Sequence, residues 1–433
     1  MAETRFKSVS RFPARASKLE VGEGVVDTTP PLGIELAGFH RPDEDKRVVT
    51  GIRQKTAARA LFMHKDDVAY VIVSLDIAAV SKAFAERVQK RIEQTVGVPA
   101  ANVRIVATHT HSMPSLRFLR QWGAIPKEYM ASLETKITRA VGLAKEDLAP
   151  ADVYVGKARV QGGNFNRTTK IWKTDAAFTR TSTDQERWLD TMLHVLHFLR
   201  AKPHRELVWY HFSAHPVCYT DTLAGPDWPG LVHDALASRW GLKPAFLQGH
   251  AGDVNPGDGD PWIGDPDETV QAVYPALHHA LSHAVPMHVN RLRLINDTVS
   301  LPLDIDLLEE QLTRYRKDPA ACTKGEWVDA GFVADWAASA AKWDRGRRNL
   351  AVSVSAIRLG DFGILFHPSE LYSYYGLAIQ RGSSLPVTLE LVTQTAWSAI
   401  FRIPRLFAIG STPLSSYPRF STFPRSSRRR RAS

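Results

Sequence analysis

Residues 68–107, VAYVIVSLDIAAVSKAFAERVQKRIEQTVGVPAANVRIVA, carry the pattern that decides the fold class. The apolar run 68–75 predicts a strand, and the apolar positions of 80–96 recur at helical spacing. Residues 102–107 then indicate a short buried strand. The preceding segment 57–64 is predicted to pair with 68–75 around a tight turn. Strands and helices therefore alternate, which is typical of an α/β domain.

The same alternation continues through most of the chain. Further strands are predicted at 152–160, 191–199, 206–213 and 243–248, a hairpin at 350–358 and 362–367, and helices at 127–145, 229–240, 268–284, 329–345 and 369–380. The sequence shows no internal repeat and no clear linker. We therefore expect residues 20–388 to form a single large α/β domain with mixed β-sheets flanked by helices.

Composition excludes several classes of protein. Of the 433 residues, 44% are hydrophobic and 23% charged, which is typical of a globular chain. No stretch of about 18 apolar residues is present, so a membrane span is not expected. The two cysteines cannot form a disulfide framework. No signal peptide is visible, which predicts a cytoplasmic protein as written, or a secreted or periplasmic one if the true start lies upstream.

The net charge of +10 is concentrated at one end of the chain. Residues 391–433 hold eight arginines and no Lys, Asp or Glu, so the rest carries only +2. This distribution does not predict a specific nucleic-acid partner. Residues 389–433 are interpreted as an aberrant tail. Its Arg/Ser/Pro-rich part, 411–433, is expected to be disordered and to bind anions non-specifically, and residues 1–19 to form a mobile lead-in.

Two histidines follow the predicted strand 102–107 within the run Ala-Thr-His-Thr-His-Ser. In extended backbone the side chains at i and i+2 point to the same side, so His109 and His111 should emerge together. One imidazole can bind a metal while the other stays free as an acid, base or hydrogen-bond donor. Isolated histidine pairs of this kind also occur in surface loops. The pair is therefore interpreted either as part of a functional site or as two surface histidines.

Three more polar segments lie at the ends of predicted strands. His215 precedes a proline, which stiffens the turn and suits a ligand, although a structural histidine would look the same. Asp253 lies in the Gly-rich turn 249–257, where backbone amides can approach a substrate oxygen. Glu370 is either a carboxylate ligand or a favourable residue in the first turn of a helix that begins near Ser369.

Two histidines and one carboxylate form a common ligand set for catalytic zinc. His109, His215 and Glu370 are therefore candidate ligands for Zn²⁺. Each follows a predicted strand, which is compatible with convergence at one sheet edge.

These segments, in this order, resemble the neutral/alkaline non-lysosomal ceramidases, zinc-dependent amidases that cleave the N-acyl bond of ceramide. The resemblance covers about residues 20–388 and is strongest at the Ala-Thr-His-Thr-His-Ser run. It implies that His109, His215 and Glu370 bind zinc and that His111 faces the scissile amide. It also implies a substrate contact for Arg167 in the Asn-Arg pair.

The resemblance further aligns Gly252 to Pro256 with a family turn and gives Asp253 the role of orienting that turn or a ligand histidine. Asn255 stands where the family has a serine, and an amide cannot form an acyl intermediate, so the attack is expected from water activated by zinc. Asn255 can still donate a hydrogen bond to an oxyanion. The implied substrate is ceramide or a related N-acyl lipid or amide.

The tail departs from the family, which continues after the Glu370 helix with a strand and a tyrosine zinc ligand. Reading the codons of residues 392–424 from their third base permits the peptide TDGLVGYLPDP, with the tyrosine codon across Ala399 and Ile400. We hypothesise a one-base frameshift near 386–391, which DNA sequencing would test. The alternative to an active hydrolase is an inactive or unstable ceramidase-like protein that lacks this tyrosine.

Overall fold

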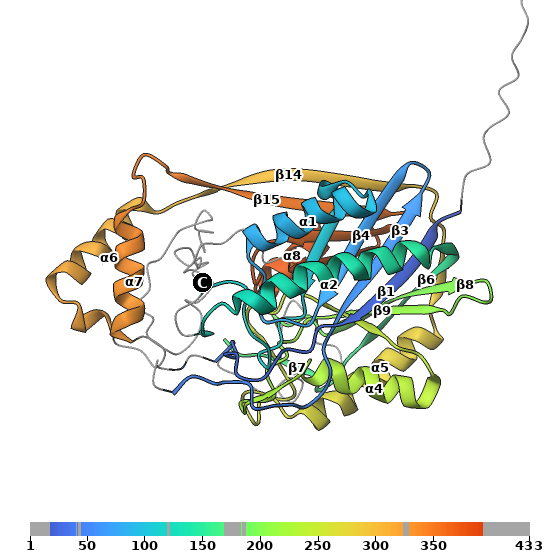
Figure 1. The fold of residues 1–433 in the computed structure, drawn as a ribbon, viewed down its shortest axis with the longest axis horizontal. Helices are drawn as coiled ribbons and strands as arrows, with labels where there is room; N and C mark the ends of the chain where they lie inside the picture. Colours follow the sequence, from blue (N-terminus) through green and yellow to red (C-terminus); the bar gives the residue numbers. More distant parts are fainter. Residues whose placement is uncertain are drawn as a thin grey trace, which may run out of the picture.

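The computed structural model describes residues 18–392, apart from 40, 42–44, 119–121, 169–182, 184–187 and 324–328. Figure 1 shows the arrangement of these residues. The predictions for most of the lead-in and for residues 393–433, including most of the hypothesised frameshift and the predicted anion binding, lie outside the described residues. No helix within the described ranges is both long and apolar enough to cross a membrane.

A mixed nine-stranded sheet forms the centre of the fold, with the main order β11-β9-β8-β6-β1-β3-β4-β5. The strands are β1 (Glu20–Asp27), β3 (Ala57–Lys65), β4 (Val68–Leu75), β5 (Val103–Ala107), β6 (Ala149–Arg159), β8 (Met192–Arg200), β9 (Leu207–Phe212), β11 (Ala245–Gln248) and β13 (Val285–Met287), the last paired with β6. The predicted hairpin of β3 and β4 is confirmed, with Ala58 opposite Leu75. β5 runs parallel to β4, and β11 runs parallel to β9.

The two ends of this strand order lie together. The Ser74 hydroxyl on β4 donates a 2.6 Å hydrogen bond to the carbonyl of Phe246 on β11. The sheet is therefore strongly curved, and the C-terminal ends of β5 and β9 are brought to one side of the molecule.

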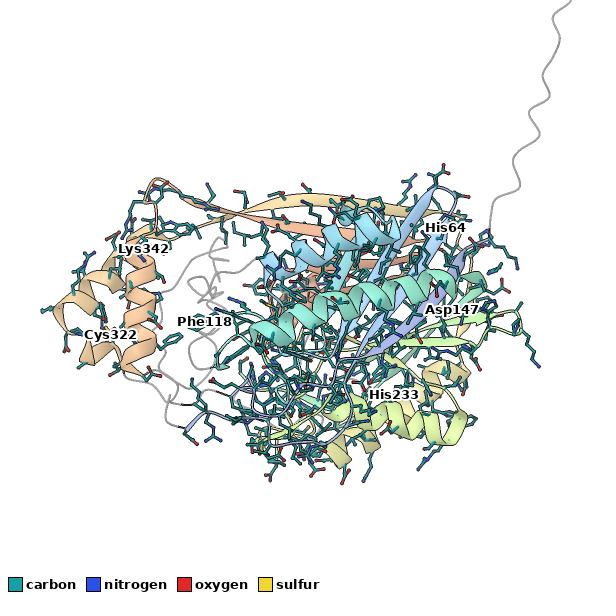
Figure 2. The ribbon with its side chains drawn as sticks, in the orientation of Figure 1. His64, Phe118, Asp147, His233, Cys322 and Lys342 are labelled. Carbon is teal, nitrogen blue, oxygen red and sulfur yellow. The ribbon has the colours of Figure 1, made fainter. Side chains whose placement is uncertain are left out.

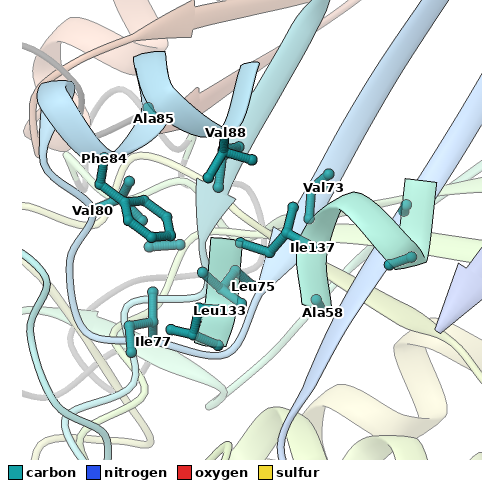
Figure 3. Packing of buried hydrophobic residues seen from close by; sticks show 14 of the residues in the cluster. Ala58, Val73, Leu75, Ile77, Val80, Phe84, Ala85, Val88, Leu133 and Ile137 are labelled. Carbon is teal, nitrogen blue, oxygen red and sulfur yellow. The ribbon is translucent and has the colours of Figure 1, made fainter. Parts of the chain in front are cut away.

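Helices cover one face of the sheet (Figure 1). The helices are α1 (Lys82–Val96), α2 (Lys127–Glu146), α4 (Trp228–Trp240) and α5 (Pro266–Ser282). Phe84, Leu133 and Ile137 of α1 and α2 pack on Val73 and Leu75 of β4, as Figure 3 shows. Because successive side chains of a strand point to opposite faces, the alternate residues of β4 remain for a second layer.

A second sheet, β14-β15-β16-β17, covers the other face. Its strands are β14 (Leu292–Pro302), β15 (Asn349–Leu359), β16 (Phe362–His367) and β17 (Val387–Val392). Ile357 and Ile364 of this sheet share a core with Leu61 and Ile72 of the large sheet. The predicted hairpin of β15 and β16 is confirmed, whereas β14 and β17 were not predicted.

The far halves of β14 and β15 form a long ribbon that carries helices α6 (Ile305–Lys317) and α7 (Ala330–Ala341) (Figure 1). Cys322 and Lys342 mark this unit in Figure 2. The two helices share a small core of their own around Leu308, Leu312 and Ala340. The sequence did not predict β14, because most of this strand is exposed and its side chains do not alternate between apolar and polar.

One boundary prediction is wrong in a way that matters. The helix predicted from Ser369 is α8 (Ser373–Gly382), which begins three residues after Glu370. The amide of Ser373 at its start donates to the Asp253 carboxylate at 2.8 Å, a contact across 120 residues. The helix therefore begins where a tertiary partner caps it, and Glu370 is not a residue of its first turn.

Candidate metal centre

His109, His215 and Glu370 come together although they are far apart in sequence. His109 lies two residues beyond β5, His215 three residues beyond β9, and Glu370 three residues beyond β16. The Oε2 atom of Glu370 lies 3.5 Å from Nε2 of His109 and 3.6 Å from Nε2 of His215. The curvature of the large sheet, together with the second sheet, is what brings the three strand ends together.

The orientation of both imidazoles is fixed through their other nitrogens. Nδ1 of His109 lies 2.6 Å from the carbonyl oxygen of Ala78, and Nδ1 of His215 lies 3.0 Å from that of Val254. A carbonyl only accepts, so each Nδ1 carries a proton and donates, which leaves the lone pair on Nε2. Metal-binding histidines in proteins are commonly held in this way.

The resulting donor set fits a cation. Two imidazole lone pairs and one carboxylate oxygen face the same point. All three are hydrogen-bond acceptors, so they favour a cation at this point and disfavour another acceptor. The Glu370 side chain is one-third exposed, whereas the Nε2 atom of His109 that faces it is buried. Burial opposes ionisation of Glu370, but His109 and His215 outweigh it and hold the pKa of the carboxyl well below its usual range.

The backbone of His109 is strained. Its φ is 67°, a left-handed conformation that residues with a side chain seldom adopt. The amide of His109 donates to the carbonyl of Ile77 at 3.1 Å, which holds the conformation. Such strain persists only where the surroundings enforce it, and it gathers at functional sites.

His111 is the third imidazole of the site. His109, His111 and His215 each have a ring nitrogen that lies within 4.8 Å of a ring nitrogen of the other two. These three histidines could therefore also hold a metal ion. Both ring nitrogens of His111 are buried and have no hydrogen-bond partner within the described residues. The ring packs edge-on against Phe39. Burial, and then the neighbouring histidines, hold the pKa of His111 well below its usual range, so this imidazole is neutral.

His215 is also neutral at ordinary pH. Burial, followed by the positive charge of Arg167, lowers its pKa to about 4. His111 and His215 then have lone pairs available without first losing a proton.

Arg167 reaches the site through a short ladder. β7 (Asn164–Asn166) pairs antiparallel with β12 (Val254–Pro256), which brings Arg167 beside the Gly-rich turn. The guanidinium donates to the side-chain oxygen of Asn255 at 3.2 Å and to the carbonyl of Gly252 at 3.0 Å. Asn255 in turn donates to the carbonyl of Trp262 at 2.7 Å. Arg167 is thus a fixed positive charge at the edge of the site.

Asp253 connects three elements around the site. Its Oδ1 accepts from the amide and hydroxyl of Ser373 at 2.8 and 3.0 Å, and its Oδ2 accepts from Asn166 at 2.9 Å. Burial, only partly offset by these bonds, raises its pKa. The group that orients His215 is the carbonyl of the neighbouring Val254.

No sequence pattern points to the carbonyls of Ala78 and Val254. Backbone carbonyls are present at every residue, so only their position in space reveals a role. Ser373 was likewise not singled out, because its partner Asp253 lies far away in sequence.

Comparisons with known proteins identify similar sequences and a similar fold. Residues 19–235, half of the chain, match the family model "Neutral/alkaline non-lysosomal ceramidase, N-terminal". A relative from Mycobacterium tuberculosis, "Neutral ceramidase", is 24% identical over 273 residues, which is 55% of this chain. The match spans only 40% of the length of that relative.

Two solved structures share the fold. The neutral ceramidase from Pseudomonas aeruginosa aligns with a TM-score of 0.63 at 18% identity, covering 87% of this chain and 67% of that one. A structure described as "Ceramidase complexed with C2" aligns with a TM-score of 0.62 at 17% identity, covering 88% of this chain and 69% of that one. At this level of identity the likeness establishes the α/β fold with mixed sheets predicted above.

Proposed function

Because this chain belongs to the neutral/alkaline non-lysosomal ceramidase family, we propose that it is a zinc-dependent amidohydrolase that cleaves the N-acyl amide bond of ceramide or a related N-acyl lipid. The observation that carries the proposal is the position of the Glu370 carboxylate, 3.5 and 3.6 Å from the lone-pair nitrogens of His109 and His215. Without a shared cation or proton this arrangement leaves two buried imidazole acceptors facing an anion, which is costly.

His109, His215 and Glu370 are the proposed ligands. Zinc bound there supplies a Lewis acid that polarises a carbonyl and makes a water molecule more acidic. The carbonyls of Ala78 and Val254 keep both imidazoles in the ligand tautomer. In this role the neutral state of His215 matters, because its pKa of about 4 removes competition from protons at neutral pH.

His111 and Arg167 are the proposed catalytic groups. His111 has two buried ring nitrogens without hydrogen-bond partners in the described part of the chain, so the neutral imidazole can donate a hydrogen bond to the substrate or take up a proton that it later returns. The guanidinium of Arg167 has hydrogen-bond donors and no acceptor, so it suits negative charge that develops on the amide oxygen. Asn255 accepts a hydrogen bond from the Arg167 guanidinium and holds it in place. Asp253, through its hydrogen bond with Ser373, fixes the Gly-rich turn that carries Asn255.

Zinc analysis and hydrolysis of an N-acylsphingosine test the proposal. The wild-type protein should bind one zinc and release fatty acid. His109→Ala and Glu370→Gln should lose hydrolysis and most of their zinc affinity. Glu20→Gln, which removes an exposed carboxylate paired with His64, is the control and should lose neither.

A His111→Ala variant separates the roles of the three imidazoles. Zinc retained with hydrolysis lost would place His111 on the substrate side, as proposed. Zinc lost together with hydrolysis would favour the three-histidine ligand set. Full hydrolysis by metal-free protein would refute zinc dependence, and bound zinc without turnover on any N-acyl amide would favour an inactive relative.

A further inference from the structure

A second set of buried charged and polar groups lies against helix α8, outside the metal centre. Its members are Asp190, His250, Gln380 and Glu390, which we name the α8 clamp. We propose that the α8 clamp positions Glu370 against His109 and His215 by fixing the helix that follows Glu370. The inference rests on the proposed function in one respect, because it takes Glu370 to be a metal ligand.

The imidazole of His250 lies between two carboxylates. Its Nε2 is 3.5 Å from Oδ2 of Asp190, and its Nδ1 is 3.4 Å from Oε2 of Glu390. Gln380 donates to the same two oxygens, at 2.9 Å to Asp190 and 3.1 Å to Glu390. Asp190, His250 and Glu390 are each 0% exposed. The clamp therefore joins α8 to β17, to the loop after β11 and to the segment before β8.

The charges of the clamp compensate one another. Burial opposes the charge on His250, but Glu390 and Asp190 outweigh it and raise its pKa. Burial also opposes ionisation of Asp190, yet His250, Gln380 and the Met192 amide together lower its pKa. Burial, only partly offset by His250, raises the pKa of Glu390. One imidazolium therefore balances one ionised carboxylate in the clamp, and removing one partner of such a set is strongly destabilising.

The clamp contacts two successive turns of α8, at Gly376 and at Gln380. A Cβ on Gly376 would lie 2.2 Å from Nδ1 of His250, so the helix backbone rests directly on the imidazole. Gln380 follows four residues later and therefore lies on the same face of the helix. Movement of α8 in either direction would break the contact at Gly376 or the two hydrogen bonds of Gln380.

Glu370 depends on α8 for its position. The residues between β16 and α8 form no helix or strand, and they are held at the helix end by Ser373 and Asp253. The amide of Gly252 donates to the carbonyl of Leu371 at 2.9 Å, so the loop that carries His250 also touches the residue after Glu370. β17, which carries Glu390, pairs with β16, the strand that leads to Glu370.

The clamp does not itself resemble a metal site. Within the described part of the chain, His109, His111 and His215 are the group whose ligand atoms all come within 4.8 Å of one another. In the clamp, Gln380 donates to one oxygen of Asp190 and to one oxygen of Glu390, and the His250 ring lies between the same two atoms. Polar partners one step removed from a ligand typically change metal affinity by about 10- to 100-fold when they are lost.

A double-mutant cycle on zinc affinity tests the proposal. Competition with a chromogenic chelator gives the zinc dissociation constant of the wild type, His250→Gln, Glu370→Gln and the double variant. We expect His250→Gln to weaken zinc binding by about 10- to 100-fold in the wild-type background and by less than about twofold when Glu370 is already replaced. His233→Gln is the matched control, a partly buried histidine on α4 that bonds to the Pro244 carbonyl and should leave zinc affinity unchanged.

An equal loss in both backgrounds, or no loss in either, would overturn the proposal, because the clamp would then act on the fold as a whole or not at all. If His250→Gln does not fold, Gln380→Met takes its place in the same cycle with the same criteria.

Amide hydrogen exchange in residues 373–382 provides a readout that needs no metal. Faster exchange in His250→Gln than in His233→Gln supports the clamp, and equal exchange overturns it. If the wild type binds no zinc, the proposed function fails while this comparison still decides whether the clamp holds α8.

Discussion

Replacing Gly38 by alanine should displace His111 and leave the proposed ligands in place. Gly38 has a φ of +97°, and a Cβ built on it would lie 2.1 Å from Cγ of His111. The shortest ordinary contact at such a position is 3.4 Å, so the ring must retreat by about 1.3 Å. His109 and His215 are held through carbonyl bonds that Gly38 does not touch.

The size of the effect follows from this displacement. A misplacement of about 1 Å in a reacting group can cost about 100-fold in rate. We therefore expect kcat/KM to fall by about 100-fold, equivalent to about 2.7 kcal/mol in the activation barrier. The left-handed backbone adds about 1–2 kcal/mol of strain that lowers the free energy of unfolding.

Three measurements separate these effects, namely kcat/KM for an N-acylsphingosine, the zinc dissociation constant and the free energy of unfolding. Gly33→Ala is the matched control, because Gly33 also has a positive φ, of +88°, while nothing lies within 4 Å of its added Cβ. Gly33→Ala should lose stability but keep activity. Zinc affinity should stay within about threefold of wild type in both variants, since the proposed ligands do not move.

The reasoning would be refuted if Gly38→Ala kept the activity of Gly33→Ala. It would equally be refuted if Gly38→Ala lost zinc as completely as Glu370→Gln, because His111 would then belong with the ligands.

Three further predictions concern the surroundings of the site and the core. Burial lowers the pKa of His211 to about 3, below the value of 6.5 for an unfolded histidine, so the folded state binds fewer protons. The contribution of His211 to the free energy of unfolding is complete above about pH 6.5 and is lost as the pH falls toward 3. Urea unfolding should therefore give a lower free energy of unfolding at pH 5 than at pH 7. Equal values at the two pH values would contradict this prediction. Arg167→Lys keeps the charge but loses the forked contacts to Asn255 and Gly252, and should lower kcat/KM by about 10- to 100-fold with zinc unchanged; wild-type kinetics would exclude the oxyanion role. Leu133→Ala, at a fully buried position, should cost about 2–5 kcal/mol in urea unfolding, whereas Leu32→Ala, at a residue that is 62% exposed, should cost little.

The alternation of strands and helices could be predicted because it depends on local periodicity. β3, β4, α2 and β9 lie within a few residues of their predicted bounds. Each buries one face against a neighbour, so apolar side chains recur with the period of the element. β14 has little to bury along most of its length, and the sequence carried no comparable signal.

The candidate residues of the site could also be named from the sequence. His109, His111 and His215 follow strands, and short polar motifs after strands are visible without coordinates. The family resemblance implied that His109 and His215 meet Glu370, but local sequence pattern alone could not show it. It depends on a sheet so curved that β4 touches β11 and on a second sheet whose strand β16 ends near Glu370.

By itself, the sequence determined the types of side chain available for chemistry and the local structure that carries them. The tertiary structure decided which atoms face one another: the carbonyls that set the imidazole tautomers, the contact of Gly38 with His111, the start of α8 at Ser373 and the clamp around His250. The physical reason is the range of the interactions. Backbone propensity and amphipathic period act over a few neighbouring residues, whereas each of these contacts joins residues separated by tens to hundreds of positions and exists only after the sheets have packed.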